Sequence, residues 1–546
     1  MSNVTSATSG KSFYEESTNR WSKGLFAWIF STDHKRIGLL YLYAVLGFFI
    51  VGMLLGILMR LELIAPGATF MTAKMYNSVF TLHGVIMIFL FIIPGIPAVF
   101  GNFFLPLQLG AKDVAFPRLN LLSWWIYIIG AILVLVSLFV PGGPIDTGWT
   151  FYIPYSVRSG ANISLALFAA FVLGFSSILT GINFVTTIHR LRAPGMKWFK
   201  MTLFTWATYA TAWMQVIATP VIGITILLVI IERYFGVGIF DPALGGDPVL
   251  FQHMFWIYSH PAVYIMILPA MGVVSEIIPT FCRRTIFGYK AIAISSLAIA
   301  FVGYLVWAHH MFTSGMSDTA RWVFSLLTFI VALPSGVKIF NWVATLYKGS
   351  IDPKTPFLWV LAFVFLFAIG GLTGLVLGAL ATNIHVHDTY FVVAHFHYVM
   401  FGGTATIFFA ALHYWWPKMT GRMYNEKVAK FVVALYFIAF NALYFPKFIL
   451  GYMGMPRRYF DYLPKFTDWQ VVSTVGSWLM GIAIIVMVIN LIKSLKSGEK
   501  ATSNPWGGVT LEWHVASPPI LENFEEIPVI TREPYDFSQL EEMKNE

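Results

Sequence analysis

The sequence contains a single cysteine, Cys282, among its 546 residues. One cysteine cannot form a disulfide within the chain, and no CxxCH motif is present for covalent attachment of haem. A dinuclear copper centre bridged by cysteine thiolates is excluded for the same reason. Any transition-metal site built by this chain must therefore rely on nitrogen or oxygen ligands.

Charge is also scarce. Charged residues make up 11% of the chain and hydrophobic residues 58%, whereas about a quarter of a typical soluble protein is charged. Apolar stretches of about 20 residues, the length that crosses a bilayer as a helix, recur along the chain. The sequence therefore predicts an all-α membrane protein, a bundle of about twelve transmembrane helices. The predicted crossings are 38–60, 78–106, 119–140, 162–188, 203–231, 251–281, 288–311, 322–347, 357–380, 389–416, 429–451 and 471–492.

Lys and Arg in the connections predict the orientation of this bundle, because positive residues are retained on the cytoplasmic side. The polar N-terminus shows no apolar signal-peptide segment. With it inside, the basic connections 189–200, 282–290 and 417–430 are cytoplasmic, and the Lys- and Arg-poor connections 234–250 and 381–390 lie outside. Both termini are expected in the cytoplasm. The net charge of +9 follows from this topology and does not indicate nucleic-acid binding.

Three regions follow from the composition. Residues 1–30 form a polar cytoplasmic N-terminal segment with a short amphipathic piece, 31–495 form one helical domain without an internal repeat, and 496–546 form an acidic cytoplasmic tail, expected to be extended. The connection 454–465 is an exception to the charge pattern, because it is basic and is predicted to lie outside.

Histidines inside the apolar stretches are the main functional signal. The segment DTYFVVAHFHYVMFG (388–402) carries His395 and His397. Two positions on a helix differ by about 200°, so the two imidazoles leave on nearly opposite faces and can serve two sites. A single membrane histidine more often just bonds a neighbouring helix. Four more of this kind weaken that interpretation; they are His83, His260, His309 and His310.

These six imidazoles divide into plausible metal sites. Imidazole is a common ligand of haem iron and copper. One face of the predicted tenth helix together with His83 would give a bis-histidine, low-spin haem, and the other face a single axial ligand. His260, His309 and His310 would supply three nitrogens to a copper. Tyr264 lies four residues after His260 and so on the same helix face, although core packing alone would also explain it.

With these motifs the chain resembles subunit I of the haem-copper oxygen reductases, specifically the A family of cytochrome c oxidases. The resemblance runs from about residue 25 to about residue 515. The stretches that carry it are HGVIMIF, GAKDVAFPRLN, GGDPVLFQHMFWIYSHPAVYI, VWAHHMFTSG, PSGVKIFNW, HDTYFVVAHFHYVM, GMPRRYFDY and NPWG.

The resemblance implies a full set of cofactor residues. His83 and His397 would ligate the low-spin haem, His395 the high-spin haem, and His260, His309 and His310 copper B. Tyr264 matches a tyrosine cross-linked to the first copper histidine, and Arg60 an arginine bonded to the formyl group of the low-spin haem. The haems are therefore expected to be haem A. The remaining cofactor residues implied are Arg457, Arg458, Trp149 and Trp256 near the haem propionates, and His387 and Asp388 for magnesium or manganese, with a further ligand from a second subunit.

The resemblance also implies two proton routes. Lys338 matches the lysine of the K-pathway, with Ser335 and Ser275 beside it. Asp113 matches the entrance acid of the D-pathway. The polar residues expected to order water above Asp113 are Asn102, Asn120, Ser123, Ser176, Ser177 and Asn183.

The chain departs from the family pattern where most A-family members carry a glutamate, two residues after the first copper histidine. This chain has Ala262 there. Tyr258 and Ser259 match the subgroup whose Tyr-Ser hydroxyls are thought to replace that carboxylate. A hydroxyl can relay a proton but does not store one near neutral pH, since the pKa of a phenol is about 10.

The function implied is the four-electron reduction of dioxygen to water, coupled to proton uptake and pumping across a bacterial cell membrane. Electrons would arrive from cytochrome c through copper A in subunit II, with a subunit III also present. The alternative within the family is a quinol oxidase, whose polar quinol cluster is absent here; Val51, Leu55, Met75 and Ser78 stand at the matching places. Nitric oxide reductase is disfavoured, because it lacks the equivalents of Tyr264 and Lys338.

A secondary transporter and an additional cation site are two further possibilities. A twelve-helix secondary transporter should show two related halves, which this sequence lacks, and its preparation would be colourless. A calcium or sodium site near Glu62 and Gly67 is weakened by Ala65, which stands where the family has a histidine.

Overall fold

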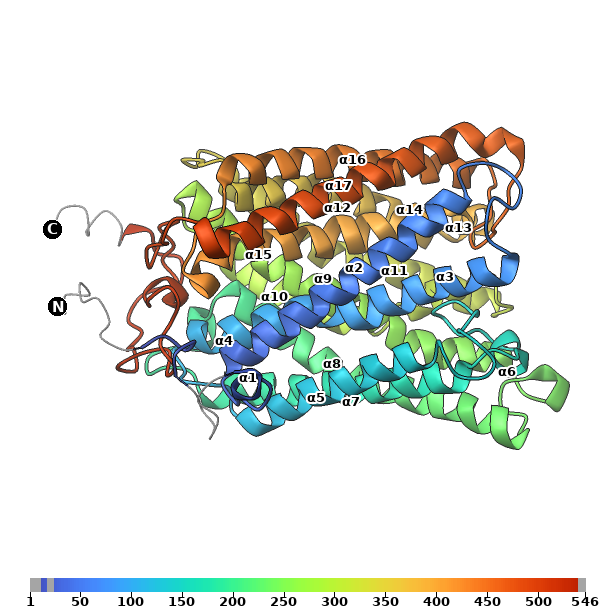
Figure 1. Cartoon of the computed structure of the whole chain (residues 1–546), viewed down its shortest axis with the longest axis horizontal. Helices are drawn as coiled ribbons and strands as arrows, with labels where there is room; N and C mark the ends of the chain where they lie inside the picture. Colours follow the sequence, from blue (N-terminus) through green and yellow to red (C-terminus); the bar gives the residue numbers. More distant parts are fainter. Residues whose placement is uncertain (1–10, 17–23, 539–546) are drawn as a thin grey trace.

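Long apolar segments in a bilayer fold into helices, because a helix satisfies every backbone polar group within the segment. The structure, a computed structural model, describes residues 11–16 and 24–538, and its long helices run along one axis (Figure 1). Eleven helical segments in this described part are long and apolar enough to cross a membrane. They are α2 (His34–Glu62), Ala73–Leu109, α5 (Pro117–Val136), α7 (Ile163–Arg190), α8 (Leu203–Phe235), α9 (Pro248–Cys282), α11 (Asp318–Leu346), α12 (Thr355–Gly378), Tyr390–Thr420, α16 (Glu426–Tyr452) and Pro464–Ser497, which contains α17 (Thr467–Ser497).

The seventh predicted crossing is shorter than expected. We expected 288–311 as one helix, but α10 ends at Gly303 after 15 residues (Tyr289–Gly303) and a separate 3-10 helix, η5 (Trp307–Met311), follows. The break places His309 and His310 on η5. The prediction of an all-helical bundle of about twelve membrane helices is confirmed.

Two of the crossings are not uniform α-helices. Ala73–Leu109 consists of α3 (Ala73–Val85), two π-helical stretches (Ile86–Ile92 and Gly95–Gly101) and α4 (Asn102–Leu109). Tyr390–Thr420 contains α14 (Tyr390–Val399), a π-helical stretch (Met400–Ala405) and α15 (Thr406–Thr420). Such π-helical insertions are frequent at functional sites, and both segments carry predicted ligands.

The ends of the helices follow local sequence signals. The Asp33 side chain accepts hydrogen bonds from the backbone N–H groups of Lys35 and Arg36 and so caps α2. The Asp247 side chain does the same at the start of α9, where Pro248 fills a position that needs no N–H donor. Shorter helices lie in the connections; they are α1 (Leu25–Ile29), α6 (Tyr155–Arg158) and α13 (Leu380–Val386), with 3-10 turns at Trp198–Lys200, Pro242–Leu244, Pro464–Phe466 and Leu511–Trp513.

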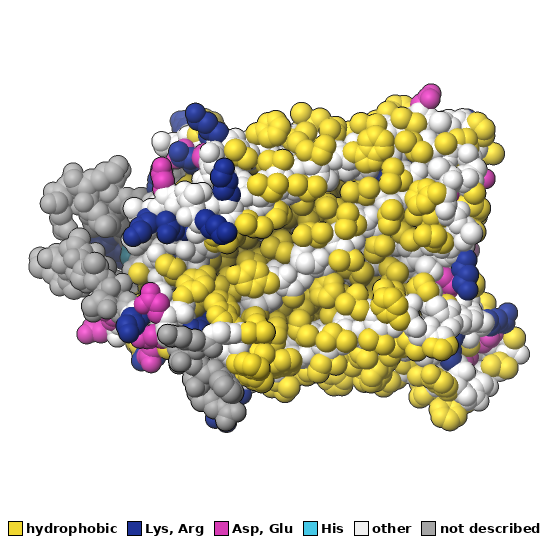
Figure 2. Space-filling model, viewed as in Figure 1, with side chains coloured by type: hydrophobic (Ala, Val, Ile, Leu, Met, Phe, Trp, Pro, Cys, Tyr) yellow, Lys and Arg dark blue, Asp and Glu magenta, His cyan; other side chains and the backbone are white. Residues whose placement is uncertain are grey.

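The surface has the pattern of a protein in a bilayer. Figure 2 shows hydrophobic side chains across the middle of the visible face and charged side chains gathered at its two ends. We call the end that holds residues 499–538 the tail end, and the opposite end, with Arg457 and Arg458, the arginine end.

The C-terminal region differs from the expected extended tail. Residues 499–538 fold across the tail end of the bundle, with the side chains of Trp513, Asn523 and Tyr535 buried. Ser12 forms an antiparallel β-bridge with Ile520, so residues 11–16 lie against the C-terminal region. Residues 1–10, 17–23 and 539–546, which belong to the predicted terminal segments, lie outside the described residues.

Candidate metal centre

A cavity of about 850 Å³ lies inside the bundle. Residues of α2, α3, α9, α11, α12, α14 and α16 line it, so segments far apart in the sequence meet here. Its walls include all six histidines predicted as ligands: His83, His260, His309, His310, His395 and His397. The fold thus gathers every predicted imidazole around one internal space.

Three of these imidazoles converge. One ligand atom from each of His260, His309 and His310 lies within 4.8 Å of the others. Nδ1 of His260 is 3.2 Å from Nε2 of His310, and Nε2 of His260 is buried without a partner. Nδ1 of His309 bonds the Thr328 hydroxyl at 2.9 Å. Three imidazole nitrogens this close together are a donor set that suits a copper ion.

The two histidines of α14 leave on different sides, as expected. Nδ1 of His395 lies 3.1 Å from the hydroxyl of Thr373 on α12. The His397 ring stacks on Tyr444 of α16, with centroids 4.3 Å apart and planes at 19°. One helix therefore offers an imidazole to each of two parts of the cavity.

The tautomers of His83 and His397 are fixed by backbone carbonyls. Nδ1–H of His83 donates to Gly52 O at 2.7 Å, and Nδ1–H of His397 donates to Val393 O at 2.8 Å. In both rings Nε2 is left as the lone-pair nitrogen. A hydrogen bond from the other ring nitrogen is the usual support of a metal-ligating histidine, so both residues fit axial ligation of a haem iron.

Aromatic side chains enclose the three-histidine cluster. Trp256 stacks on His310 with centroids 3.7 Å apart and donates from Nε1 to the Tyr152 hydroxyl at 2.7 Å. Trp149 meets Trp256 edge to face. The Tyr264 ring lies 4.7 Å from the His260 ring, so the spacing of four residues does bring these two side chains together.

Arg60 enters the cavity from α2. Its Nη2 donates to Gln470 O at 2.8 Å, to Gln470 Oε1 at 2.7 Å and to the Thr474 hydroxyl at 3.0 Å, while its Nε is buried without a partner. A buried guanidinium N–H without an acceptor is costly. The oxygen of a bound group would satisfy it.

The arginine end of the cavity is positive. Arg457 and Arg458 line the cavity, and Arg457 lies over the Phe396 ring at 5.6 Å. Burial, and then the adjacent Arg457 cation, lower the pKa of Arg458 to about 10. Nη1 of Arg457 is 3.7 Å from Asp388, whose side chain is 65% exposed. Two largely buried guanidinium groups facing a cavity suit carboxylates on its occupant.

His387 and Asp388 stand together beside these arginines. Nε2 of His387 lies 3.6 Å from Asp388 Oδ2. Burial lowers the pKa of His387, which favours the neutral ring that can ligate a metal. The exposed Asp388 carboxylate leaves room for a ligand from outside the chain.

Lys338 is buried in α11 with a partner that the sequence analysis did not single out. Its Nζ donates to the Ser296 hydroxyl of α10 at 2.7 Å and to Ile292 O at 3.2 Å. Ser335 lines the cavity one turn before it. Ser275 instead accepts a hydrogen bond from Trp342 Nε1 at 2.9 Å.

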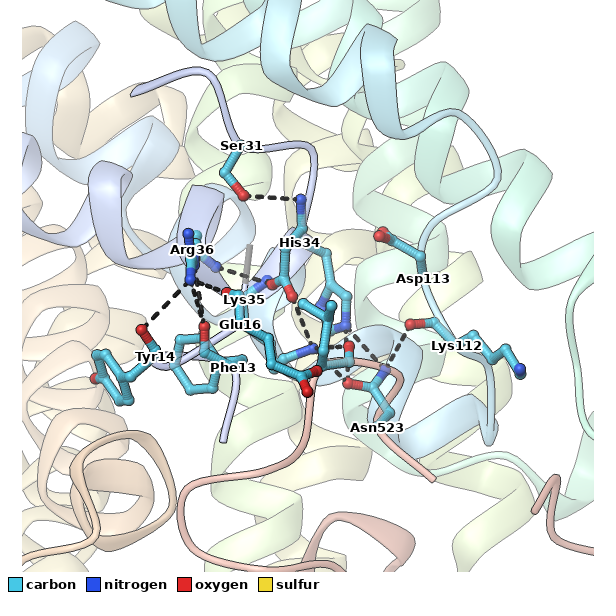
Figure 3. A network of polar contacts seen from close by, with 12 residues as sticks. Phe13, Tyr14, Glu16, Ser31, His34, Lys35, Arg36, Lys112, Asp113 and Asn523 are labelled. Atoms are coloured by element: carbon cyan, nitrogen blue, oxygen red, sulfur yellow. Dashed lines mark hydrogen bonds and ion pairs between the residues drawn. The ribbon is translucent and has the colours of Figure 1, made fainter. Parts of the chain in front are cut away.

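Asp113 lies at the tail end on the loop between α4 and α5. Burial, and then the nearby Asp33 carboxylate, raise the pKa of Asp113 to about 8. Figure 3 shows it beside a network built on His34, Lys35 and Asn523. His34 Nδ1 donates to Asn102 O at 2.7 Å, Asn523 Nδ2 lies 2.9 Å from His34 Nε2, and Lys35 Nζ donates to Asn523 Oδ1 at 2.8 Å.

The side chains predicted above Asp113 divide into two groups. Asn120 and Asn102 have buried amide atoms without a partner in the described structure, as expected of groups that bond water. The Ser123 and Ser176 hydroxyls instead meet at Tyr41, each 3.2 Å from its hydroxyl, and Asn183 accepts a hydrogen bond from Phe116 N at 2.9 Å. Tyr41 was not singled out from the sequence, because one tyrosine in an apolar helix carries no distinct signal.

Tyr258 and Ser259 are buried in α9 but are not among the cavity-lining residues. The Ser259 hydroxyl has no hydrogen-bond partner among the described residues. Lys447 of α16, by contrast, does line the cavity and was missed. Its signal was present, since a lysine inside the apolar stretch 429–451 is costly in a membrane.

Comparisons with known proteins agree with this geometry. The family model described as "Cytochrome C and Quinol oxidase polypeptide I" matches residues 36–479. The chain is 48% identical to cytochrome c oxidase subunit 1 of Synechocystis sp., covering 93% of this chain and 92% of that one. It is 42% identical to cytochrome c oxidase subunit 1 of Cereibacter sphaeroides, covering 93% and 96%. A solved haem-copper terminal oxidase dimer has a similar fold, with a TM-score of 0.70, 20% identity and coverage of 93% of this chain and 89% of that chain.

Proposed function

Because the chain belongs to the cytochrome c and quinol oxidase polypeptide I family, we propose that it reduces dioxygen to water with electrons from cytochrome c. The protein is a membrane oxidoreductase, subunit I of a haem-copper oxidase. The observation that carries the proposal is the convergence of six imidazoles from α3, α9, η5 and α14 on one internal cavity. Neither a transporter nor a structural subunit requires that arrangement.

We divide the ligands among the metals as in the sequence-based prediction. His83 and His397, each with Nδ1–H donated to a carbonyl, would hold the low-spin haem through Nε2, and His395 the high-spin haem. His260, His309 and His310 would hold copper B. When bound, these groups supply the electron transfer and the oxygen-reducing chemistry. The 850 Å³ cavity, with its imidazole nitrogens and the buried Arg60 Nε, fits two haems and a copper ion.

Several side chains would position the haems. The free Nε of Arg60 suits a formyl oxygen, which supports haem A. Arg457 and Arg458 would pair with propionates through charge-assisted bonds, and Trp149 and Trp256 would wall that region. Tyr264, whose ring lies 4.7 Å from the His260 ring, would give up a proton during oxygen reduction.

Protons would reach the site from the tail end, which we assign to the cytoplasm together with both termini. Asp113 would take them up, with Asn102 and Asn120 ordering water above it. Lys338 would serve the second route through Ser296, and Ser335 lies between Lys338 and the cavity. Tyr258 and Ser259, in the Tyr-Ser subgroup pattern, would relay protons for pumping where this chain has Ala262.

The partners follow from what the chain lacks. With one cysteine it cannot hold copper A, which we assign to a subunit II of a bacterial cell-membrane complex that also has a subunit III. His387 and the exposed Asp388 would share magnesium or manganese with that subunit. A quinol donor is disfavoured because Val51, Leu55, Met75 and Ser78 stand at the places of the quinol cluster.

The proposal is tested on the purified complex by oxygen uptake and optical spectroscopy. We expect uptake with reduced cytochrome c, little uptake with a quinol, and split Soret and alpha bands. Uptake with quinol alone would contradict the donor assignment. A colourless preparation would contradict the oxidase assignment itself.

A further inference from the structure

Lys447 is a buried cation that no part of the proposed mechanism uses. It lies on α16, five residues before the helix ends at Tyr452, and its side chain is only 6% exposed. Among the residues that the structure describes, no carboxylate or carbonyl accepts a hydrogen bond from its Nζ. An unpaired ammonium in a membrane interior is expensive and usually functional.

The surroundings of Lys447 belong to one part of the cavity. Nζ lies 4.6 Å from the centroid of the Tyr444 ring, and the same ring stacks on His397. Lys447 lines the cavity with His83 and His397 and interacts electrostatically with both. Lys447 therefore lies beside His83 and His397, the two imidazoles assigned to the low-spin haem.

A second cation faces the same space. Lys447 and Arg60 interact electrostatically, and Arg60 has a buried Nε without a partner. Among the described residues the Glu62 carboxylate forms no ion pair with either cation; its two oxygens accept hydrogen bonds from the backbone of Thr69, Phe70 and Met71. Two cations in an internal cavity, without an anion paired to either among the described residues, favour an electron-rich occupant.

We propose that Lys447 is a second cationic contact of the low-spin haem, donating to an oxygen substituent of the tetrapyrrole and raising the reduction potential of its iron. This inference rests on the proposed function. A positive charge near the iron favours the ferrous over the ferric state, because the electron that the donor adds lowers the net charge of the haem. The oxygen belongs either to the formyl group or to a propionate.

Lys447→Met in the intact complex tests this, with the low-spin haem titrated spectroelectrochemically. Methionine keeps most of the volume and removes the charge. We expect the reduction equilibrium to shift about tenfold toward the ferric state, which is about 59 mV for a one-electron couple. Lys447→Arg should keep the wild-type potential. Lys465→Met, the same substitution outside the cavity, is the matched control and should change nothing.

The alpha band identifies the oxygen that Lys447 contacts. A formyl group is conjugated with the ring, so losing a bond to it shifts the band together with the potential. A propionate is not conjugated, so only the potential changes. Either result supports the proposal.

Failure of this inference can be told apart from failure of the proposed function. A Lys447→Met complex with a normal low-spin spectrum and an unchanged potential would overturn the role of Lys447 alone. A wild-type complex without a low-spin haem would overturn both. Loss of the low-spin haem in Lys447→Met, with retention in Lys447→Arg, would support the contact.

Discussion

At the scale of single residues, the histidines are the main support for the proposed metal sites, because their environment leaves a nitrogen lone pair free. His83 and His397 each donate Nδ1–H to a backbone carbonyl, and such a bond fixes the tautomer and the orientation of the ring. His260 keeps an unpartnered Nε2 in the protein interior. A ring nitrogen left without a partner among the described residues is available to a metal, which fits the proposed ligand roles.

Lys338→Met is expected to stall reduction of the haem and copper pair while the low-spin haem is still reduced. In the proposed second proton route Lys338, which is hydrogen-bonded to Ser296, carries the proton, and methionine has no proton to give. We expect reduction of the high-spin haem to slow by about a hundredfold or more, measured by stopped-flow spectroscopy. Lys348→Met, on the loop after α11, is the control. Normal reduction in Lys338→Met would remove this residue from the proton route.

The raised pKa of Asp113 predicts that proton uptake depends on pH. Because its pKa is raised to about 8, the carboxyl holds its proton below that pH and loses it above. Proton uptake should therefore decline as pH rises through about 8 in the wild type. Asp113→Asn should be slow at every pH and lack this step, as followed with a pH indicator dye.

Asp318→Asn removes an exposed carboxylate, with its side chain 88% accessible, and should keep the wild-type profile. An unchanged profile in Asp113→Asn would show that protons enter elsewhere.

At the scale of elements, the site depends on how closely helices approach one another. A Cβ on Gly451 of α16 would lie 2.0 Å from Phe391 N of α14, the helix that carries His395 and His397. One on Gly374 of α12 would lie 3.1 Å from Cε1 of His395. Glycine at these places sets the distance between the ligand helix and its neighbours.

Gly451→Ala should therefore loosen the contact between α14 and α16. We expect a destabilisation of about 1–3 kcal/mol, typical of overpacking, and partial loss of haem, measured by thermal unfolding and the haem-to-protein ratio. Gly47→Ala in α2 is the control, because a Cβ there meets nothing within 4 Å. Equal stability of the two variants would contradict the close approach.

The sequence predicted the elements better than their interruptions. Crossing helices are visible as apolar stretches, because the bilayer fixes their length and composition. The break after Gly303 and the π-helical stretch at Met400–Ala405 are set by packing between distant helices and leave no periodic signal. The spacing of four residues could place Tyr264 beside His260, because both lie on one helix. It could not reveal Ser296 as the partner of Lys338, because these two residues lie on different helices.

At the scale of the whole molecule, the two ends of the chain close the tail end of the bundle. Asn523 bonds His34, Lys35 and the backbone of Ala111, next to Asp113 (Figure 3). The acidic composition predicted only an extended tail. The buried contacts of Trp513 and Tyr535 could not be anticipated, because their partners Tyr414 and Glu276 lie 99 and 259 residues away in the sequence.

Asn523→Ala should destabilise this end, because buried Lys35 Nζ loses an acceptor and buried His34 Nε2 loses the N–H that donates to it. We expect a loss of about 1–3 kcal/mol, read as a lower midpoint of thermal unfolding. Glu522→Ala removes only an exposed ion pair with Lys112, and such pairs contribute about 0–1 kcal/mol. If the two variants melted alike, Asn523 would not anchor the tail.

The most direct test of the central claim is the iron and copper content of the purified complex together with their positions by anomalous scattering. The account predicts two irons and one copper inside the cavity of this chain, with the copper at His260, His309 and His310 and an iron between His83 and His397. A cavity that holds no metal, or a map in which any of these rings faces away from the metal, would contradict it.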